Sequence, residues 1–226
     1  KPLESEEIFT QKKSSSHLIL KTDRLLRARF RKNRQAKLGP DISNKRTLIH
    51  SILNSSSVKK EISNFSKGSK KVEAAQNKRA YKYALEICSD ISYPVIYLYD
   101  KALNWFWNNR YDGLEIIGIE KISDLAVGNS LIYTPSHRSH IDYLALSFKL
   151  YTNNLMLPQI VAGKNLNLPV LGRILRNGGA FFMRRSFGAN KLYSKVFFEH
   201  LRKLFQRGYS IEFFPEGGRT RTGRLL

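Results

Sequence analysis

The stretch Thr-Pro-Ser-His-Arg-Ser-His-Ile-Asp occupies residues 134–142 and directly follows the apolar run Leu-Ile-Tyr at 131–133. An apolar run that stops at a proline is typical of a buried strand that ends there, and Ser139 is then the predicted N-cap of a helix over residues 141–151. His137 is therefore expected at the carboxyl end of a strand, with Asp142 in the first turn of the helix. Imidazole titrates near neutral pH and needs a partner that fixes its tautomer, so this spacing suggests a general base with its orienting carboxylate.

A second stretch gives this pair more weight, because a His and an Asp five residues apart are also common in purely structural roles. The sequence Phe-Phe-Pro-Glu-Gly-Gly-Arg-Thr-Arg-Thr-Gly at 213–223 follows another apolar run and places Glu216, two glycines and two arginines at a second strand end. Together the two stretches resemble the glycerolipid acyltransferase superfamily, with its His-x4-Asp motif and its Phe-Pro-Glu-Gly motif. Between them, Gly-Ala-Phe-Phe-Met-Arg-Arg at 179–185 is similar to the family's intermediate block.

The sequence from 137 to 226 resembles the membrane-bound bacterial glycerol-3-phosphate acyltransferases in particular. The match is close over residues 110–226 and loose before them. The resemblance implies transfer of a fatty acyl group from acyl-CoA or acyl carrier protein to the 1-hydroxyl of sn-glycerol-3-phosphate, the first step of phospholipid biosynthesis, at the cytoplasmic face of the bacterial inner membrane. That family continues beyond this point with a further strand motif, so we expect the chain to be a C-terminally truncated fragment.

The resemblance also implies roles for individual residues. His137 would take the proton of the substrate hydroxyl while Asp142 holds the imidazole, and Glu216 and Gly217 match the family's Glu and Gly. A phosphate-bearing substrate needs arginine side chains, which bind phosphate oxygens in pairs. The candidates are Arg185, Arg219 and Arg221, with Arg184 as the alternative to Arg185 because side chains alternate along a strand.

Other substrates and one other class of function stay open. Within the same chemistry, dihydroxyacetone phosphate or lysophosphatidate is the alternative acceptor. A basic module that binds anionic lipid or RNA is the alternative of another class, although three motifs at strand ends argue against it. We expect no metal, because the sequence shows no His, Cys or carboxylate cluster at ligand spacing. No cofactor beyond the acyl donor and no nucleic acid partner are expected.

The charge of the chain favours anionic partners. The formal net charge is +21, and residues 1–80 hold 20 Lys and Arg against 7 Asp and Glu. Such a field attracts acidic membrane surfaces, acidic carrier proteins, nucleic acids or phosphorylated metabolites, and an anionic membrane surface is the expected macromolecular partner. The basic run at 24–37 is predicted to bind anionic surfaces or to form a solvated arm. The single Cys88 excludes an intramolecular disulfide, and no apolar run is long enough to predict a membrane-spanning helix.

The apolar periodicity predicts an α/β domain with a largely parallel sheet flanked by helices, preceded by a helical, basic N-terminal region. We divide the chain into a basic segment at 1–70, an amphipathic helical region at 71–112 and an incomplete acyltransferase domain at 113–226. Within 72–110, Pro94 should kink or split the helix, and the aromatic stripe fits either core packing or a lipid interface. The predicted strands are 114–119, 130–134, 159–162, 180–184 and 209–214, and the later predicted helices are 170–176 and 190–207.

Overall fold

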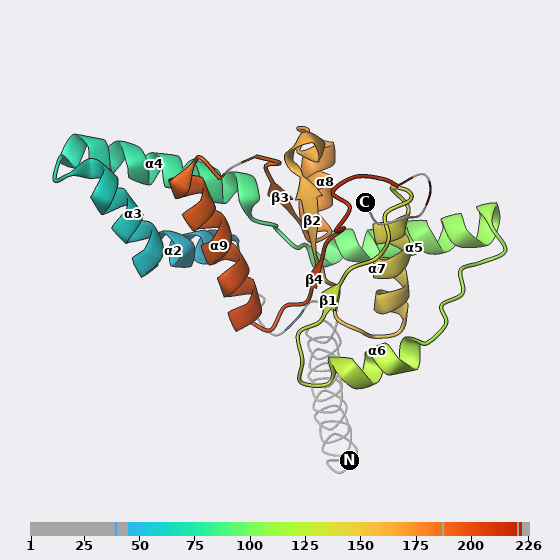
Figure 1. Cartoon of the computed structure of the whole chain (residues 1–226). Helices are drawn as coiled ribbons and strands as arrows, with labels where there is room; N and C mark the ends of the chain where they lie inside the picture. The colour runs from blue at the N-terminus through green and yellow to red at the C-terminus, as the bar shows by residue number, and fades with distance from the viewer. Residues whose placement is uncertain (1–38, 40–44, 187, 221, 223–226) are drawn as a thin grey trace, which may run out of the picture.

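The fold is described from a computed structural model, which places residues 39, 45–186, 188–220 and 222. In this part of the chain a small parallel sheet stands between two groups of helices (Figure 1). The predicted basic run at 24–37 lies outside the described residues. The α/β class with a parallel sheet is confirmed.

The sheet has four strands in the order β1-β4-β2-β3, and every neighbouring pair is parallel. The strands are β1 (Ile132–Tyr133), β2 (Gln159–Gly163), β3 (Ala180–Met183) and β4 (Ile211–Glu212). Because the last strand inserts between β1 and β2, Ile211 is in register with Ile132 on one side and with Gln159 on the other. Parallel strands end at one edge of a sheet, so the loops that follow β1, β3 and β4 meet there.

Helices make each crossover between these strands. The crossover elements are α7 (Asp142–Thr152), then η1 (Lys164–Leu166) with α8 (Leu171–Asn177), and finally α9 (Lys191–Gln206). Asn190 is the N-cap of α9, and its side chain accepts a hydrogen bond from the Tyr193 N–H at 3.0 Å. The predictions of a strand at 159–162, a helix at 170–176, a strand at 180–184 and a helix at 190–207 are confirmed within a few residues.

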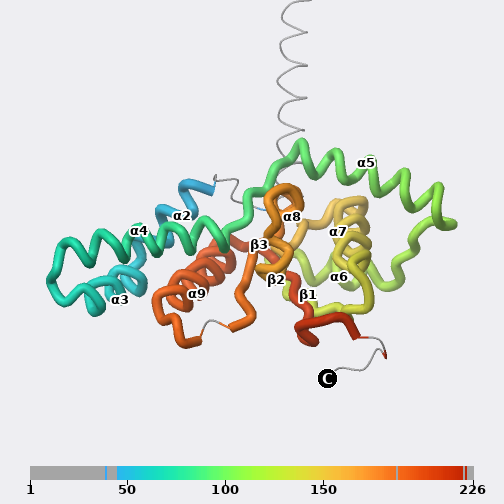
Figure 2. The backbone as a smooth tube through the Cα atoms, turned by 90° about the horizontal axis from the view of Figure 1, so that it is seen from above, coloured from blue at the N-terminus to red at the C-terminus, as the bar shows by residue number. Residues whose placement is uncertain are grey.

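The N-terminal helices share a hydrophobic core with α9 and β3. These helices are α2 (Lys45–Leu53), α3 (Ser56–Ser66) and α4 (Lys70–Ile87). Ile52 of α2, Val58 of α3 and Ala84 of α4 are fully buried in one cluster with Phe181 of β3 and Tyr193 of α9. Figure 2 shows α3, α4 and α9 side by side. The described part of the predicted basic segment, residues 45–70, therefore contributes apolar side chains to the core beside the sheet.

The long helical region splits as Pro94 suggests. The helix α4 ends at Ile87, and α5 (Tyr93–Arg110) begins one residue before the proline, where a missing N–H costs nothing. The aromatic residues of α5 differ in burial: Trp107 is buried, whereas Tyr97 and Trp105 are largely exposed. None of the helices that the structure describes is long and apolar enough to cross a membrane.

The predicted strand at 114–119 is wrong. Residues 113–118 are irregular in the structure, and α6 (Ile119–Ala126) begins at the last residue of the prediction. Ile117 is 92% exposed, so this segment has no packed face that would hold a strand against the sheet. The apolar run resembles a strand in composition, but strand formation needs a pairing partner that the fold does not supply here.

Candidate active site

The imidazole of His137 stands at the carboxyl edge of the sheet, in the loop between β1 and α7. Its Nδ1 lies 3.2 Å from Oδ2 of Asp142, and the ring packs against Phe214 with the ring centroids 4.1 Å apart. The His137 side chain is only 13% exposed. The predicted His–Asp pair is thus formed in the structure. Because Nδ1 is the atom that faces Asp142, Nε2 lies on the other side of the ring.

Asp142 also holds the loop that carries the histidine. Its Oδ2 accepts hydrogen bonds from the backbone N–H groups of Arg138 and Ser139, both at 2.7 Å. Burial opposes ionisation of this carboxyl, but the two backbone bonds and the His137 imidazole outweigh burial and hold the pKa of Asp142 below its ordinary value. The residue is therefore an anion at neutral pH, with its charge directed at the loop and the imidazole.

The predicted N-cap at Ser139 is wrong. The helix begins at Asp142 with Ile141 at the cap position, and Ser139 Oγ accepts only the N–H of Ile141 inside the preceding loop. The Asp142 carboxylate, rather than a serine hydroxyl, accepts the hydrogen bonds from the Arg138 and Ser139 N–H groups of this loop. A single residue thus closes the loop and contacts the imidazole.

The second motif is bound directly to the first. Oε1 of Glu216 accepts a hydrogen bond from the backbone N–H of His137 at 3.3 Å, and the N–H of Thr220 donates to the His137 carbonyl at 2.7 Å. The pKa of Glu216 is lowered, first by a bond from its own backbone N–H and then, against some desolvation, by His137 and Ser136. Gly217 follows with φ +61°, a left-handed conformation that favours glycine, and its Cα is open to the surroundings.

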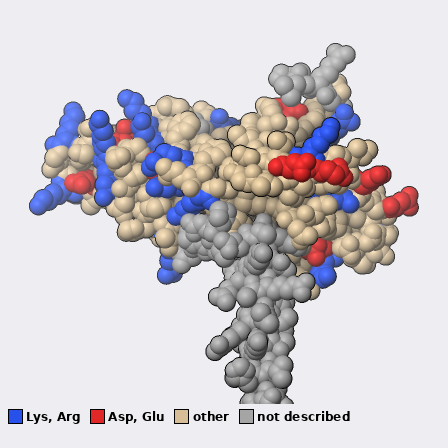
Figure 3. Space-filling model, turned by 90° about the horizontal axis from the view of Figure 1, so that it is seen from below, with Lys and Arg blue, Asp and Glu red and all other residues tan. Residues whose placement is uncertain are grey.

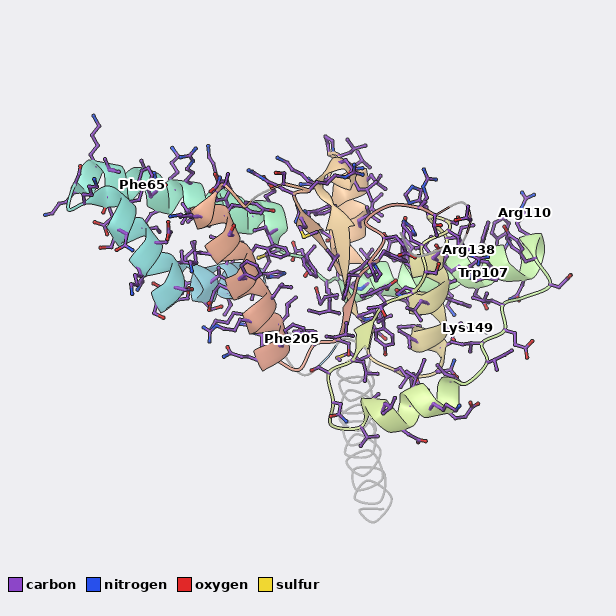
Figure 4. The ribbon with its side chains drawn as sticks, in the orientation of Figure 1. Phe65, Trp107, Arg110, Arg138, Lys149 and Phe205 are labelled. Atoms are coloured by element: carbon purple, nitrogen blue, oxygen red, sulfur yellow. The ribbon has the colours of Figure 1, made fainter. Side chains whose placement is uncertain are left out.

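A cavity of about 780 Å³ opens beside the imidazole. Its wall includes His137, Gly217, Arg185 and Arg219. The rest of the wall is mostly apolar and comes from the strands, from the segment between β2 and β3 and from three helices. The helices α5, α7 and α9 contribute Leu103, Leu144, Phe148, Phe197, Leu201 and Phe205. Figure 4 shows Phe205 near the C-terminal end of α9 and Arg138 near the N-terminal end of α7, on opposite sides of the sheet. The arrangement joins a base, two cations and an apolar volume.

The structure separates the two arginines that follow β3. Arg185 lines the cavity, whereas Arg184 forms a two-point ion pair with Glu86 of α4, with Nε–Oε1 at 2.7 Å and Nη2–Oε2 at 2.8 Å. The Arg184 guanidinium also lies over the Tyr193 ring at 4.6 Å. Because successive side chains of an extended segment point in opposite directions, Arg184 packs against α4 and Arg185 lines the cavity. Arg221 lies outside the described residues.

Sequence reasoning missed Glu212, which lies in β4 directly behind the site. Its side chain is fully buried, and neither carboxylate oxygen has a hydrogen-bond partner among the described residues. Burial, and then the charge of Asp142, raises the pKa of Glu212 to about 8. The only sequence signal is an acid inside the apolar run 209–214, where a buried strand would otherwise be uncharged. At neutral pH this residue is a neutral acid beside an ionised one.

Comparisons with known proteins identify the family of this chain. Residues 114–226 match the family described as Acyltransferase. The whole chain is 47% identical over 225 residues to a glycerol-3-phosphate acyltransferase of Pseudomonas paraeruginosa, and 44% identical to proteins of the same name from Pseudomonas syringae pv. tomato and Ectopseudomonas mendocina. In each case the alignment covers 100% of this chain and 27% of the relative, so the chain spans about a quarter of the length of these proteins. The predicted family is confirmed, and the chain belongs to the Acyltransferase family.

Proposed function

We propose that this chain carries the catalytic centre of an enzyme that transfers a fatty acyl group from acyl-CoA or acyl carrier protein to the 1-hydroxyl of sn-glycerol-3-phosphate. The observation that carries the proposal is that His137, paired with Asp142, lines a largely apolar cavity that Arg185 and Arg219 also line. A base, an anchor for phosphate and room for a hydrocarbon chain are the elements that this reaction needs.

The chemistry is a direct transfer. With Nδ1 facing Asp142, Nε2 of His137 accepts the proton of the substrate hydroxyl as its oxygen attacks the thioester carbonyl carbon. The tetrahedral intermediate then collapses, the carbon–sulfur bond breaks, and the imidazolium returns the proton to the thiolate. The anionic Asp142 stabilises the imidazolium between these two steps. The base acts on the substrate, so the mechanism requires no acyl-enzyme intermediate and no cofactor apart from the acyl donor.

The two arginines at the cavity distinguish a phosphorylated acceptor from a simple alcohol. A guanidinium binds two phosphate oxygens in parallel, which fixes the direction of the attached glycerol as well as its position. The names of the relatives favour glycerol-3-phosphate over dihydroxyacetone phosphate and lysophosphatidate. Anchoring the phosphate at Arg185 and Arg219 directs the far hydroxyl of glycerol toward His137.

We also propose that the enzyme works at the cytoplasmic face of a bacterial inner membrane. Its product and its acyl chains are amphipathic, and the strongly basic chain is attracted by anionic lipid headgroups. Exposed apolar side chains on the described surface support a peripheral association. A membrane location places the enzyme where its product is used.

An acyl-transfer assay on the intact protein tests the proposed reaction. His137→Ala is expected to lower kcat by about 10²- to 10⁴-fold, the usual contribution of a general base. The matched control is His50→Ala, which removes an exposed histidine of α2 and should leave kcat unchanged. Arg185→Ala combined with Arg219→Ala should raise KM for glycerol-3-phosphate much more than KM for the acyl donor. Full activity of the His137→Ala protein would remove the proposed base.

A further inference from the structure

The segment between β2 and β3 has two distinct faces. Its inner face contributes Asn165, Leu166 and Leu175 to the cavity. Its outer face carries Leu168, Val170, Leu171 and Ile174, which are 40–73% exposed and are absent from the cavity wall. Four large apolar side chains exposed within seven residues form a patch that water alone solvates poorly, and such patches mark interaction sites.

The part of the chain that carries this patch has charges of one sign. Residues 143–198 contain eight Lys or Arg and no Asp or Glu. Lys164 at the start of the segment lies 3.4 Å from Glu86 and is partly neutralised, whereas Arg173 is exposed on α8 among the apolar side chains. An apolar surface that carries an exposed arginine, in a part of the chain without acids, is complementary to a lipid bilayer with anionic headgroups.

The opposite end of the molecule has the opposite character. Figure 1 shows α8 at the upper end and α6 at the lower end, and acidic side chains gather over the α6 part in the view from below (Figure 3). Asp112, Glu115, Glu120 and Asp124 are all exposed in that part of the chain. Near an anionic surface, these acidic side chains turn the α6 end away from the membrane.

We propose that residues 164–174 form a membrane-docking surface, in which Leu168, Val170 and Leu171 enter the interfacial region of an anionic bilayer while Arg173 contacts its headgroups. Because the inner face of the same segment lines the cavity, docking would set the cavity wall against the membrane and give an acyl chain a short, dry path to His137. The inference that an acyl chain follows this path rests on the proposed acyl transfer. The docking itself does not, since it depends only on the outer face.

The direct test is co-sedimentation of the intact protein with vesicles of mixed phosphatidylglycerol and phosphatidylcholine, and with vesicles of phosphatidylcholine alone. Leu168→Ser with Val170→Ser should lower the partition constant about tenfold on both kinds of vesicle, because burial of apolar area is lost. Arg173→Glu should lower binding about tenfold on the anionic vesicles and hardly at all on the neutral ones.

Matched controls come from the acidic end. Ile117→Ser with Val127→Ser removes two side chains that are 92% and 77% exposed, and Lys121→Glu reverses an exposed charge on α6. Both controls should leave vesicle binding unchanged. Equal losses in the control and test variants, or no binding by the unmodified protein, would overturn the docking surface. Should the Leu168→Ser, Val170→Ser protein show a lowered Tm, the comparison of Arg173→Glu with Lys121→Glu decides alone.

Two kinetic measurements distinguish membrane docking from the acyl-transfer reaction and from binding of an acidic protein. Acyl transfer in detergent micelles should be unchanged in the surface variants and lost in His137→Ala. If neither the unmodified protein nor the surface variants transferred an acyl group, while the unmodified protein still bound vesicles, the proposed reaction would be refuted. The docking surface would remain supported. Unchanged vesicle binding of Arg173→Glu with a raised KM for acyl carrier protein donors would overturn the docking surface in favour of an acidic protein partner.

Discussion

The carboxylate Oε1 of Glu216 accepts a hydrogen bond from the backbone N–H of His137 at 3.3 Å, across 79 residues of sequence. The Thr220 N–H donates to the carbonyl of the same histidine at 2.7 Å. The stretch 213–223 therefore binds both the backbone N–H and the backbone carbonyl of His137. The loop that carries the base is therefore positioned by the loop that follows β4.

Replacement of Glu216 tests this coupling. Glu216→Ala removes the acceptor for the His137 N–H and should lower both kcat and Tm, because the loop of the base loses one of its anchors. Glu216→Gln keeps an acceptor oxygen at the same place and should restore the Tm. If kcat also returns with the glutamine, the role of Glu216 is positional; if only the Tm returns, its negative charge acts in the reaction.

Asp142→Asn is expected to affect catalysis more than it affects folding. The amide retains one oxygen for the Arg138 and Ser139 N–H groups but cannot stabilise an imidazolium, so kcat should fall by about 10²-fold or more. The stability lost should be about 1–2 kcal/mol, the cost of weaker bonds to a charged acceptor. Steady-state kinetics and urea unfolding measure the two effects. A large loss of stability with kcat preserved would contradict the assigned role.

The adjacent arginines at the end of β3 should behave in opposite ways. Arg184→Ala breaks the ion pair with Glu86 and should lower the free energy of unfolding by about 2 kcal/mol, because both partners are mostly buried. Arg185→Ala should leave stability nearly unchanged and raise KM for glycerol-3-phosphate about tenfold or more. Chemical unfolding and initial-rate kinetics on the two proteins check this contrast, which fails if both variants lose stability alike.

Glu212 should make the protein less stable as the pH rises. The unfolded chain ionises this residue near 4.5, whereas the folded protein keeps its proton up to about 8, so unfolding releases a proton in that window and the free energy of unfolding falls. Glu212→Gln removes this loss and should gain about 4 kcal/mol at pH 8 but little at pH 4.5. Thermal unfolding at the two pH values measures the difference, and an equal gain at both would contradict a protonated Glu212.

Local sequence patterns predicted most of the α/β part. The predictions of β2, β3 and α9 are confirmed. They succeeded because burial on a sheet or on a helix face leaves a periodic pattern of apolar residues in the sequence. The failure at 114–119 has the converse reason, since the apolar composition there is right for a strand but no neighbouring strand pairs with it. Strand pairing is a property of the whole fold and leaves no local trace.

The sequence by itself determined the chemistry: a His, an Asp, a Glu-Gly turn and several arginines at strand ends, in the pattern of the Acyltransferase family. Only the tertiary structure decided which of these groups meet. The insertion of β4 between β1 and β2 joins Glu216 to His137, the contact with Glu86 withdraws Arg184 from the cavity, and the burial of Glu212 puts a second acid behind Asp142. The physical reason is that residue type fixes what a group can do, whereas distance and desolvation, which depend on the packing of segments far apart in sequence, fix which partner it finds and which charge it carries.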